Sequence, residues 1–255
     1  MRGELVYGRN AALEALRGPR VGFALLLADG IRADKRIAEL VALANRRGIA
    51  ERVVPRDALD RALDGANHQG VALDAAPFEY ADIDLSPPAS ELVTLALDHV
   101  QDPRNLGTLL RTADACGVHQ VLIPTDRAVI VTPAVVNASA GAVEHLRVAL
   151  VTNLARTLDD LKAAGWWVIG LEAHEQSTDL FTTTLPRPAV LVVGSEGEGI
   201  GRNVLRRCDL LVNLPMRGQV SSLNAATAAS VALYHLMVTG ADIVPTKVET
   251  MADPV

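Results

Sequence analysis

The sequence predicts an α/β protein built on a mainly parallel sheet with flanking helices. Six short apolar runs in the second part of the chain are rich in β-branched residues, as is typical of strands buried on both faces. Helical patterns lie between several of these runs, and this alternation indicates a parallel sheet. Because 49% of the 255 residues are hydrophobic, the chain can also bury a sizeable core.

The first 76 residues are expected to form a small N-terminal domain of alternating helices and strands. Within 33–46, four apolar residues recur at helical spacing, and Gly48 ends the pattern. The turn-forming stretch GANHQG precedes the last strand of this domain. The expected elements, in order, are a helix over 10–16, a strand over 22–28, a helix over 33–46, a strand over 51–54, a helix over 56–63 and a strand over 70–73.

A proline-rich segment, residues 77–91, separates this domain from a larger one. It lacks sustained periodicity and is therefore interpreted as a linker. The larger domain is expected over 92–240, followed by a loosely ordered tail over 241–255. Its expected strands are 92–97, 121–123, 146–151, 166–171, 189–194 and 210–214.

Composition argues against several classes of protein. No stretch approaches the roughly 18 apolar residues of a membrane helix. The charged start MRGELVYGRN does not resemble a signal peptide, so a cytoplasmic location is expected. Cys116 and Cys208 lack metal-ligand spacing and are interpreted as buried free thiols. The six histidines show no H-E-x-x-H pairing, so no metal is expected.

The net charge of −6 argues against binding of nucleic acid through a global positive field. The first 76 residues carry 12 basic and 10 acidic side chains, whereas residues 77–255 carry 12 and 20. Nearly all the basic residues are arginine, which suits bidentate phosphate contacts but equally suits surface ion pairs. Any phosphate recognition must therefore come from local patches.

Polar residues follow three of the expected strands, where ligands bind in open α/β sheets. The first such segment, 98–118, places Asn105 near a helix start and Arg111 six residues further along. Spacing alone also allows Arg111 to lie on the solvent face of that helix. The second segment, 192–201, is rich in glycine and contains Glu196, but it matches neither the G-x-G-x-x-G nor the Walker pattern. A tight turn and a ligand loop therefore both remain possible interpretations of it.

The third segment, 213–230, passes from a polar loop into a run of alanine and small polar residues. Ser221 or Ser222 could cap the helix that follows, which by itself would explain a serine there. The small residues after Asn224 are suited to close packing against another element or subunit. Although each segment has a purely structural interpretation, their joint occurrence after three strands of one sheet favours a site.

The three segments contain the motifs VQDPRNLGTLLRTADACGV, VVGSEGEGI and LPMRGQVSSLNAATA, in this order. This ordered set resembles the SpoU (TrmH-like) branch of the SPOUT RNA 2′-O-ribose methyltransferases. LVYGRNAALEAL and NHQGVAL, nearer the start, are similar to the substrate-binding domain of the RlmB-like subgroup, which methylates a guanosine of large-subunit (23S) ribosomal RNA. The resemblance therefore covers nearly the whole chain.

The resemblance implies a trefoil knot in the C-terminal domain, an exception to the rule that protein chains are unknotted. It also implies S-adenosylmethionine as cofactor, a homodimer, and a small RNA-binding N-terminal domain. The residues that match the family's polar active-site positions are Asn105, Arg111, Glu196, Ser222 and Asn224. The residues expected near the cofactor are Gly194, Leu214, Met216 and Leu223. The weaker candidates for RNA contact are Arg9, His68 and Gln69, the last two of which have an equally plausible folding role.

The implied reaction is attack of a ribose 2′-oxygen on an activated methyl group. Arg111 is the family's proposed base, but a guanidinium has a pKa above ~12 and rarely gives up its proton. The alternative role is to hold a phosphate beside the target ribose. Transfer RNA is the alternative substrate. A ribosome-assembly factor with a dead methyltransferase site and a nicotinamide- or nucleotide-dependent enzyme are the rival classes.

Overall fold

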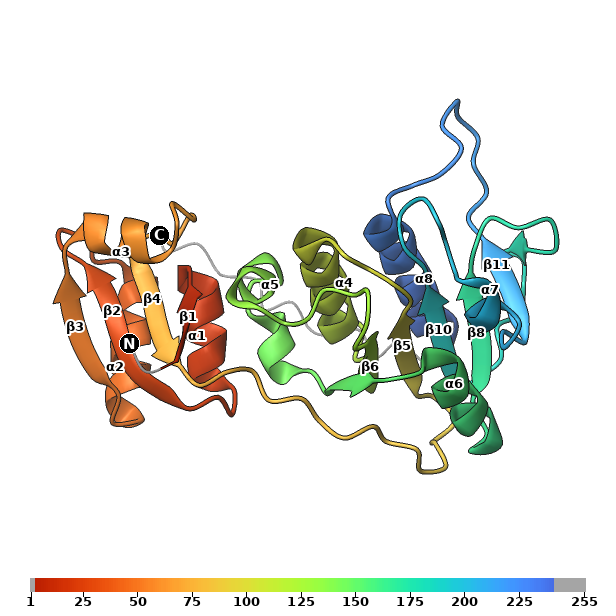
Figure 1. The fold of residues 1–255 in the computed structure, drawn as a ribbon, viewed down its shortest axis with the longest axis horizontal. Coiled ribbons are helices and arrows are strands. Elements are labelled where there is room, and N and C mark those ends of the chain that lie inside the picture. Colours follow the sequence, from red (N-terminus) through yellow and green to blue (C-terminus); the bar gives the residue numbers. More distant parts are fainter. Residues whose placement is uncertain (1–2, 241–255) are drawn as a thin grey trace, which may run out of the picture.

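The computed structural model describes residues 3–240, which form two sheets, each with its own helices (Figure 1). The four-stranded sheet has the order β1-β4-β2-β3, and the seven-stranded sheet has the order β7-β6-β5-β10-β8-β11-β9. We refer to residues 4–75 and 93–240 as the N-terminal and C-terminal lobes. The α/β prediction is confirmed. The expected tail, 241–255, lies outside the described residues.

The N-terminal lobe contains one strand more than the sequence predicted. This strand, β1, pairs antiparallel with β4, which also pairs antiparallel with β2, whereas β2 and β3 are parallel. Asp34 caps α2, because its Oδ1 accepts from the Ile37 amide at 2.9 Å. The elements are β1 (Glu4–Tyr7), α1 (Arg9–Arg17), β2 (Gly22–Ala28), α2 (Lys35–Arg46), β3 (Ala50–Val54), α3 (Arg56–Ala62) and β4 (Val71–Ala75).

All six strands predicted for the C-terminal lobe are present, and a two-residue strand, β9, extends the edge of the sheet. Every recorded pairing in this sheet is parallel. The elements are β5 (Val93–Leu97), α4 (Pro103–Ala115), β6 (Gln120–Pro124), α5 (Pro133–Ala138), the 3-10 helix η1 (Ala142–His145), β7 (Val148–Val151), α6 (Leu154–Ala163), β8 (Trp167–Leu171), β9 (Thr178–Asp179), β10 (Ala189–Val193), α7 (Arg202–Leu205), β11 (Leu210–Asn213) and α8 (Ala225–Gly240).

Successive residues of the central strands face two different helix layers. In β5, Leu95 and Leu97 belong to the core that contains α4 and α8, whereas Ala96 belongs to the core that contains α6. In β10, Leu191 belongs to the core that contains α4 and α8, and Val192 belongs to the core that contains α6. Because side chains alternate along a strand, a strand covered on both faces must be apolar throughout, which is why these runs were readable in the sequence.

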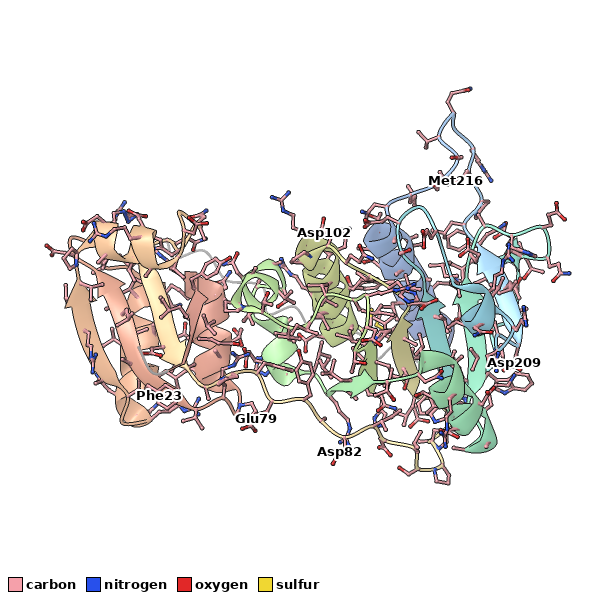
Figure 2. All side chains as sticks on the ribbon, in the orientation of Figure 1. Phe23, Glu79, Asp82, Asp102, Asp209 and Met216 are labelled. Carbon is pink, nitrogen blue, oxygen red and sulfur yellow. The ribbon has the colours of Figure 1, made fainter. Side chains whose placement is uncertain are left out.

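The segment predicted as a linker contains no helix or strand but is held along the C-terminal lobe. The Tyr80 hydroxyl accepts from the Val131 amide at 2.9 Å. The side-chain amide of Gln120 forms two bonds with the backbone of Asp84, each at 2.9 Å. Figure 1 shows the segment running along the lower edge of the molecule, and Figure 2 labels Glu79 and Asp82 on it.

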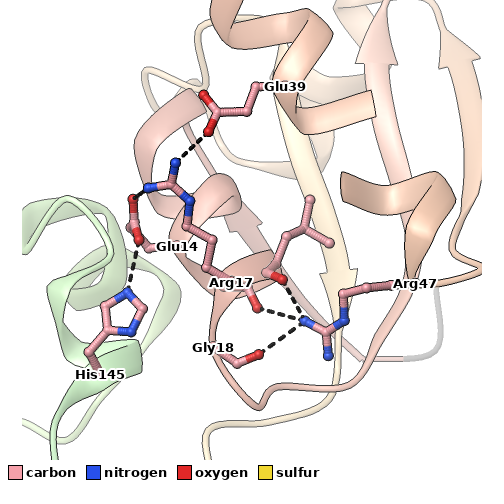
Figure 3. Close-up of polar contacts among 8 residues, drawn as sticks. Glu14, Arg17, Gly18, Glu39, Arg47 and His145 are labelled. Carbon is pink, nitrogen blue, oxygen red and sulfur yellow. Dashed lines mark hydrogen bonds and ion pairs between the residues drawn. The ribbon is translucent and has the colours of Figure 1, made fainter. Parts of the chain in front are cut away.

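A buried ion pair joins the two lobes. Arg20 contacts Glu144 through Nη2 and Oε1 at 2.9 Å, and its Nε donates to the other carboxylate oxygen at 3.1 Å. The two side chains are 3% and 2% exposed. Nearby, Glu14 binds both Arg17 and His145 at the surface of the same interface (Figure 3). These contacts fix the orientation of one lobe against the other.

Within residues 3–240, none of the helices combines the length and the apolar character needed to cross a membrane.

We predict that Glu144→Gln destabilises the protein by about 3–5 kcal/mol, because it leaves the Arg20 charge buried without its main partner. The matched control is Glu14→Gln at the same interface, where exposed pairs contribute about 0–1 kcal/mol. Urea unfolding of the three proteins measures the difference. Equal stability of the two variants would contradict an anchoring role for the buried pair.

Candidate active site

A cleft of about 490 Å³ opens where β8, β10 and β11 end and α8 begins. This is the edge of the sheet at which open α/β folds bind ligands. It is lined by Leu171, Glu172, Ala173, Val193, Gly194, Ser195, Glu196, Gly197, Gly199, Asn213, Leu214, Met216, Ser221, Ser222, Leu223, Asn224, Ala225 and Ala228. In Figure 2, Met216 lies on the loop that projects beyond the sheet.

The glycine-rich segment 194–201 is both a tight turn and a wall of this cleft. Ser195 and Gly199 exchange two backbone hydrogen bonds of 3.1 Å each, which closes the turn. A Cβ on Gly194 would lie 2.1 Å from the carbonyl carbon of Gly199, so only glycine fits there. The tight-turn interpretation is therefore confirmed for this loop, which we call the glycine loop, and its role as a ligand loop stays a prediction.

Two carboxylates hold the end of the glycine loop, and they follow β5 and β8, the strands on either side of β10. Asp98, which follows β5, accepts from the Gly201 amide at 2.7 Å and is 1% exposed. Glu172, which follows β8, accepts from the Ile200 amide through Oε2 at 2.8 Å. Sequence reasoning missed both residues. The available signal was an acidic residue directly after a buried strand.

Three polar side chains, one from each sequence motif, meet beside the cleft. Asn105 on α4 donates through Nδ2 to Glu196 on the glycine loop. Asn224 donates to Oδ1 of Asn105 at 3.2 Å and to Oε1 of Glu196 at 3.3 Å. The structure thus joins segments that are 91 and 119 residues apart in the chain. We call these three residues the polar triad.

Asn224, and not a serine, caps α8. Its Oδ1 accepts from the amides of Ala226 at 2.9 Å and Thr227 at 3.2 Å, as an N-cap side chain does. The expectation that Ser221 or Ser222 caps this helix is therefore wrong. The helix begins at Ala225, so the serines lie too far upstream of its free amides. Both serines instead line the cleft.

The four residues predicted to lie near a cofactor, Gly194, Leu214, Met216 and Leu223, all line the cleft. Leu223 is 42% exposed and Met216 is 36% exposed. Large apolar side chains this open to solvent are suited to contact a ligand or a partner. Their role as cofactor contacts stays a prediction.

Arg111 is not part of the cleft lining. It lies on an exposed position of α4, six residues beyond Asn105, which is about 9 Å along a helix axis. Among the described residues it forms no recorded ion pair or hydrogen bond. The adjacent Thr112 bonds Ser230 at 2.9 Å, which marks the face of α4 that packs on α8. Within a single chain, Arg111 therefore occupies the solvent face.

The RNA-contact candidates of the N-terminal lobe lie together. Arg9 donates to the Gln69 carbonyl at 3.3 Å and pairs with Asp34. His68 is 3% exposed, bonds Asp60 through Nε2 at 2.9 Å and accepts from the Gly70 amide through Nδ1 at 3.0 Å. Both of its ring nitrogens are thus used inside the fold, which favours the folding role for His68.

Neither cysteine has the properties of a nucleophile. Both thiols are free, as expected, and both are partly buried. Burial raises the pKa of Cys116 to about 11 and that of Cys208 to about 12. Within residues 3–240 there is also no cluster of three or more histidine, cysteine or acidic side chains able to hold a metal ion.

Fold and site together define a methyltransferase of the SpoU type. The SpoU rRNA methylase family matches residues 92–234, and the RNA 2′-O ribose methyltransferase substrate-binding family matches residues 5–81. YacO of Bacillus subtilis (strain 168), a putative TrmH family tRNA/rRNA methyltransferase, is 42% identical over 238 residues, covering 91% of this chain and 94% of the relative. The chain belongs to the SpoU methylase family of RNA methyltransferases, and the resemblance inferred from the motifs is confirmed.

Solved structures give the same result. The SpoU methyltransferase AviRb from Streptomyces viridochromogenes, in complex with the cofactor AdoMet, is 27% identical with a TM-score of 0.75, covering 92% of this chain and 89% of that one. An RNA methyltransferase of the TrmH family from Porphyromonas gingivalis, described as putative, is 29% identical with a TM-score of 0.72 and the same two coverages. The similarity therefore spans both lobes.

We predict that Gly194→Ala lowers the free energy of unfolding by about 1–3 kcal/mol, because the added methyl group meets the Gly199 backbone. The matched control is Gly218→Ala in the loop after β11, where a Cβ meets nothing within 4 Å. Its effect should stay within about 0.5 kcal/mol. Chemical denaturation without ligand measures both, and a Gly194→Ala protein as stable as the control would refute the tight contact.

Proposed function

We propose that this protein transfers a methyl group from S-adenosylmethionine to a ribose 2′-hydroxyl of RNA. The observation that carries the proposal is the polar triad, in which Asn105, Glu196 and Asn224 converge from three separate motifs at one edge of the cleft. The relative crystallised with AdoMet supports the choice of donor.

The cleft fits S-adenosylmethionine in size, polarity and charge. Its volume lies within the range of small-molecule sites, and it combines apolar walls with a few polar groups. Among the described residues of its lining, Glu172 and Glu196 carry negative charge and none is lysine or arginine. Such a site favours a sulfonium cation and disfavours the phosphates of NAD or ATP. This charge balance argues against the nucleotide-dependent rival.

S-adenosylmethionine, when bound, supplies an electrophilic methyl group on a positively charged sulfur. We assign the contact surface to Gly194, Leu214, Met216 and Leu223, because these residues line the same cleft as the triad members Glu196 and Asn224. The glycine loop brings bare backbone to the cleft, so a ligand can approach its amides closely.

The triad and Ser222 are assigned to the ribose. Asn105 and Asn224 are fixed by mutual bonds, and Glu196 accepts from both, so the three present a rigid polar edge. Holding the 2′-oxygen in line with the methyl group can contribute about 7–11 kcal/mol in favourable cases. Proton removal typically contributes roughly 10²–10⁴-fold, so we expect positioning to be the larger effect.

The substrate is proposed to be a guanosine of large-subunit (23S) ribosomal RNA, with transfer RNA as the alternative. Residues 1–76 are proposed as the RNA-binding domain and 92–240 as the methyltransferase domain, connected by 77–91. The match of residues 5–81 to a substrate-binding family supports this division. Arg9 and Gln69 adjoin each other there and remain the proposed RNA contacts, whereas His68 shapes the turn.

A homodimer is proposed as the active unit. The outer face of α8 leaves Tyr234 and Val238 exposed, at 48% and 49%, beside Phe181 at 52%. With Val231 and Ser230 they line a shallow, mainly apolar groove. Apolar side chains gathered in this way commonly mark a protein interface. A second copy of the chain would cover them.

Titration of the purified chain with S-adenosylmethionine tests the function. We expect binding in the micromolar range, and transfer of a labelled methyl group to ribose 2′-oxygens of 23S rRNA from cells lacking this gene. Asn105→Ala should reduce transfer by about 10²-fold or more, because an orienting contact is lost. Labelling of transfer RNA alone would favour the alternative substrate. RNA binding without cofactor binding at millimolar concentration would favour an assembly factor.

The role of Arg111 is tested by the pH dependence of single-turnover rates. We propose that it holds a phosphate beside the target ribose, since a guanidinium stays charged below pH ~12. Arg111→Lys should then lower the rate by about 10-fold or more, because the bidentate grip is lost, and leave the pH profile unchanged. Arg104→Lys, at another exposed position of α4, is the control and should change the rate less than about twofold. A shift of the profile in Arg111→Lys alone would favour the base role.

A further inference from the structure

Glu172 places a carboxylate in the cleft wall, and the proposed chemistry assigns no group of the cofactor or the RNA to it. It is partly buried, follows β8, and lines the cleft. Its Oε2 accepts from the Ile200 amide, whereas among the described residues its Oε1 has no recorded hydrogen-bond partner and no lysine or arginine pairs with it. A carboxylate offers about four acceptor positions, so most of its capacity remains unused.

Glu172 lies beside the glycine loop, directly after the strand next to the one that leads into the loop. In the sheet register Leu171 pairs with Val193, so Glu172 and Gly194 follow two neighbouring parallel strands at the same level. A Cβ on Gly199 would lie 2.4 Å from the Glu172 carboxylate, so the carboxylate and the glycine loop are in direct contact. The polar triad, in contrast, contacts this loop through Glu196. Glu172 therefore contacts the loop at Gly199 and Ile200, whereas the triad contacts it at Glu196.

The chemistry of a nucleoside matches this arrangement. A ribose presents two neighbouring hydroxyl donors, and an ionised carboxylate is an acceptor-only group with two oxygens. Doubly wound α/β folds that bind dinucleotides use an acidic residue in this way, next to a glycine-rich turn that approaches the ligand. The present cleft has the same two parts on adjoining strands, although its glycine pattern is different.

We infer that Glu172 binds the ribose hydroxyls of the cofactor's nucleoside, while its Oε2 retains the Ile200 amide and so couples ribose binding to the shape of the glycine loop. The inference rests on the proposed use of S-adenosylmethionine. It adds a recognition residue that the sequence motifs do not contain. It also gives the cleft a means to distinguish ribonucleosides from their deoxy analogues.

The test is calorimetric binding of the full chain to S-adenosylmethionine, 5′-methylthioadenosine and the 2′,3′-dideoxy analogue of 5′-methylthioadenosine. Hydrogen bonds to a charged group predict that the wild type prefers the ribo form over the dideoxy form by about 10-fold or more. In Glu172→Gln, whose amide oxygen still accepts from Ile200, this preference should fall to about threefold or less. Glu175→Gln, an exposed neighbour outside the cleft lining, is the matched control and should keep the preference.

Each alternative result of this binding experiment contradicts one step of the inference. Equal weakening of ribo and dideoxy ligands by Glu172→Gln would mean that the carboxylate only holds the loop. Weakening of S-adenosylmethionine without weakening of 5′-methylthioadenosine would move the contact to the amino-acid end of the cofactor. Both results overturn the inference and leave the proposed function intact. Failure of the wild type to bind any of the three ligands overturns both. Equal melting temperatures of the variants exclude unfolding as the cause.

Discussion

The two bonds that cap α8 determine how the active site can be arranged. Because the amides of Ala226 and Thr227 require an acceptor, the side-chain oxygen of Asn224 must face the helix. Its amide nitrogen must then point the other way, toward Asn105 and Glu196. That orientation leaves Asn105 Oδ1 as an acceptor and its Nδ2 as a donor to Glu196. A helix start thus sets the hydrogen-bond direction of the whole triad.

The glycine loop is held in a way that suits the charge expected of the ligand. Its anchors are carboxylates, Asp98 and Glu172, which bind backbone amides where lysine or arginine would otherwise serve as partners. Of the two, Glu172 lines the cleft, and the amide donor that it binds does not neutralise it, so the cleft retains negative charge. A phosphate-binding glycine loop needs the opposite balance, with its amides free and a cation nearby. The missing Walker lysine in the sequence and the acidic lining of the cleft both disfavour a phosphate ligand.

The sequence was most informative where local physics decides the structure. The apolar strands of the C-terminal lobe were predictable because burial on both faces removes polar positions from them. Strand β1 was missed because its four residues depend on pairing with β4, about 70 residues away. The cap of α8 was assigned to serines because spacing alone does not locate the first free amide of a helix. Membership of the triad followed from motif resemblance, whereas its bonds depend on the tertiary fold.

The position of Arg111 shows why a single chain leaves its role open. Its neighbour Thr112 bonds Ser230, and Ser230 lines the apolar groove on α8 together with Phe181 and Tyr234. A second copy seated on that groove would therefore lie near α4, the helix that carries Arg111. In the proposed homodimer, the surroundings of this guanidinium are set by the partner and by RNA and not by its own chain. The same contact that buries the groove would then also decide whether Arg111 reaches a phosphate.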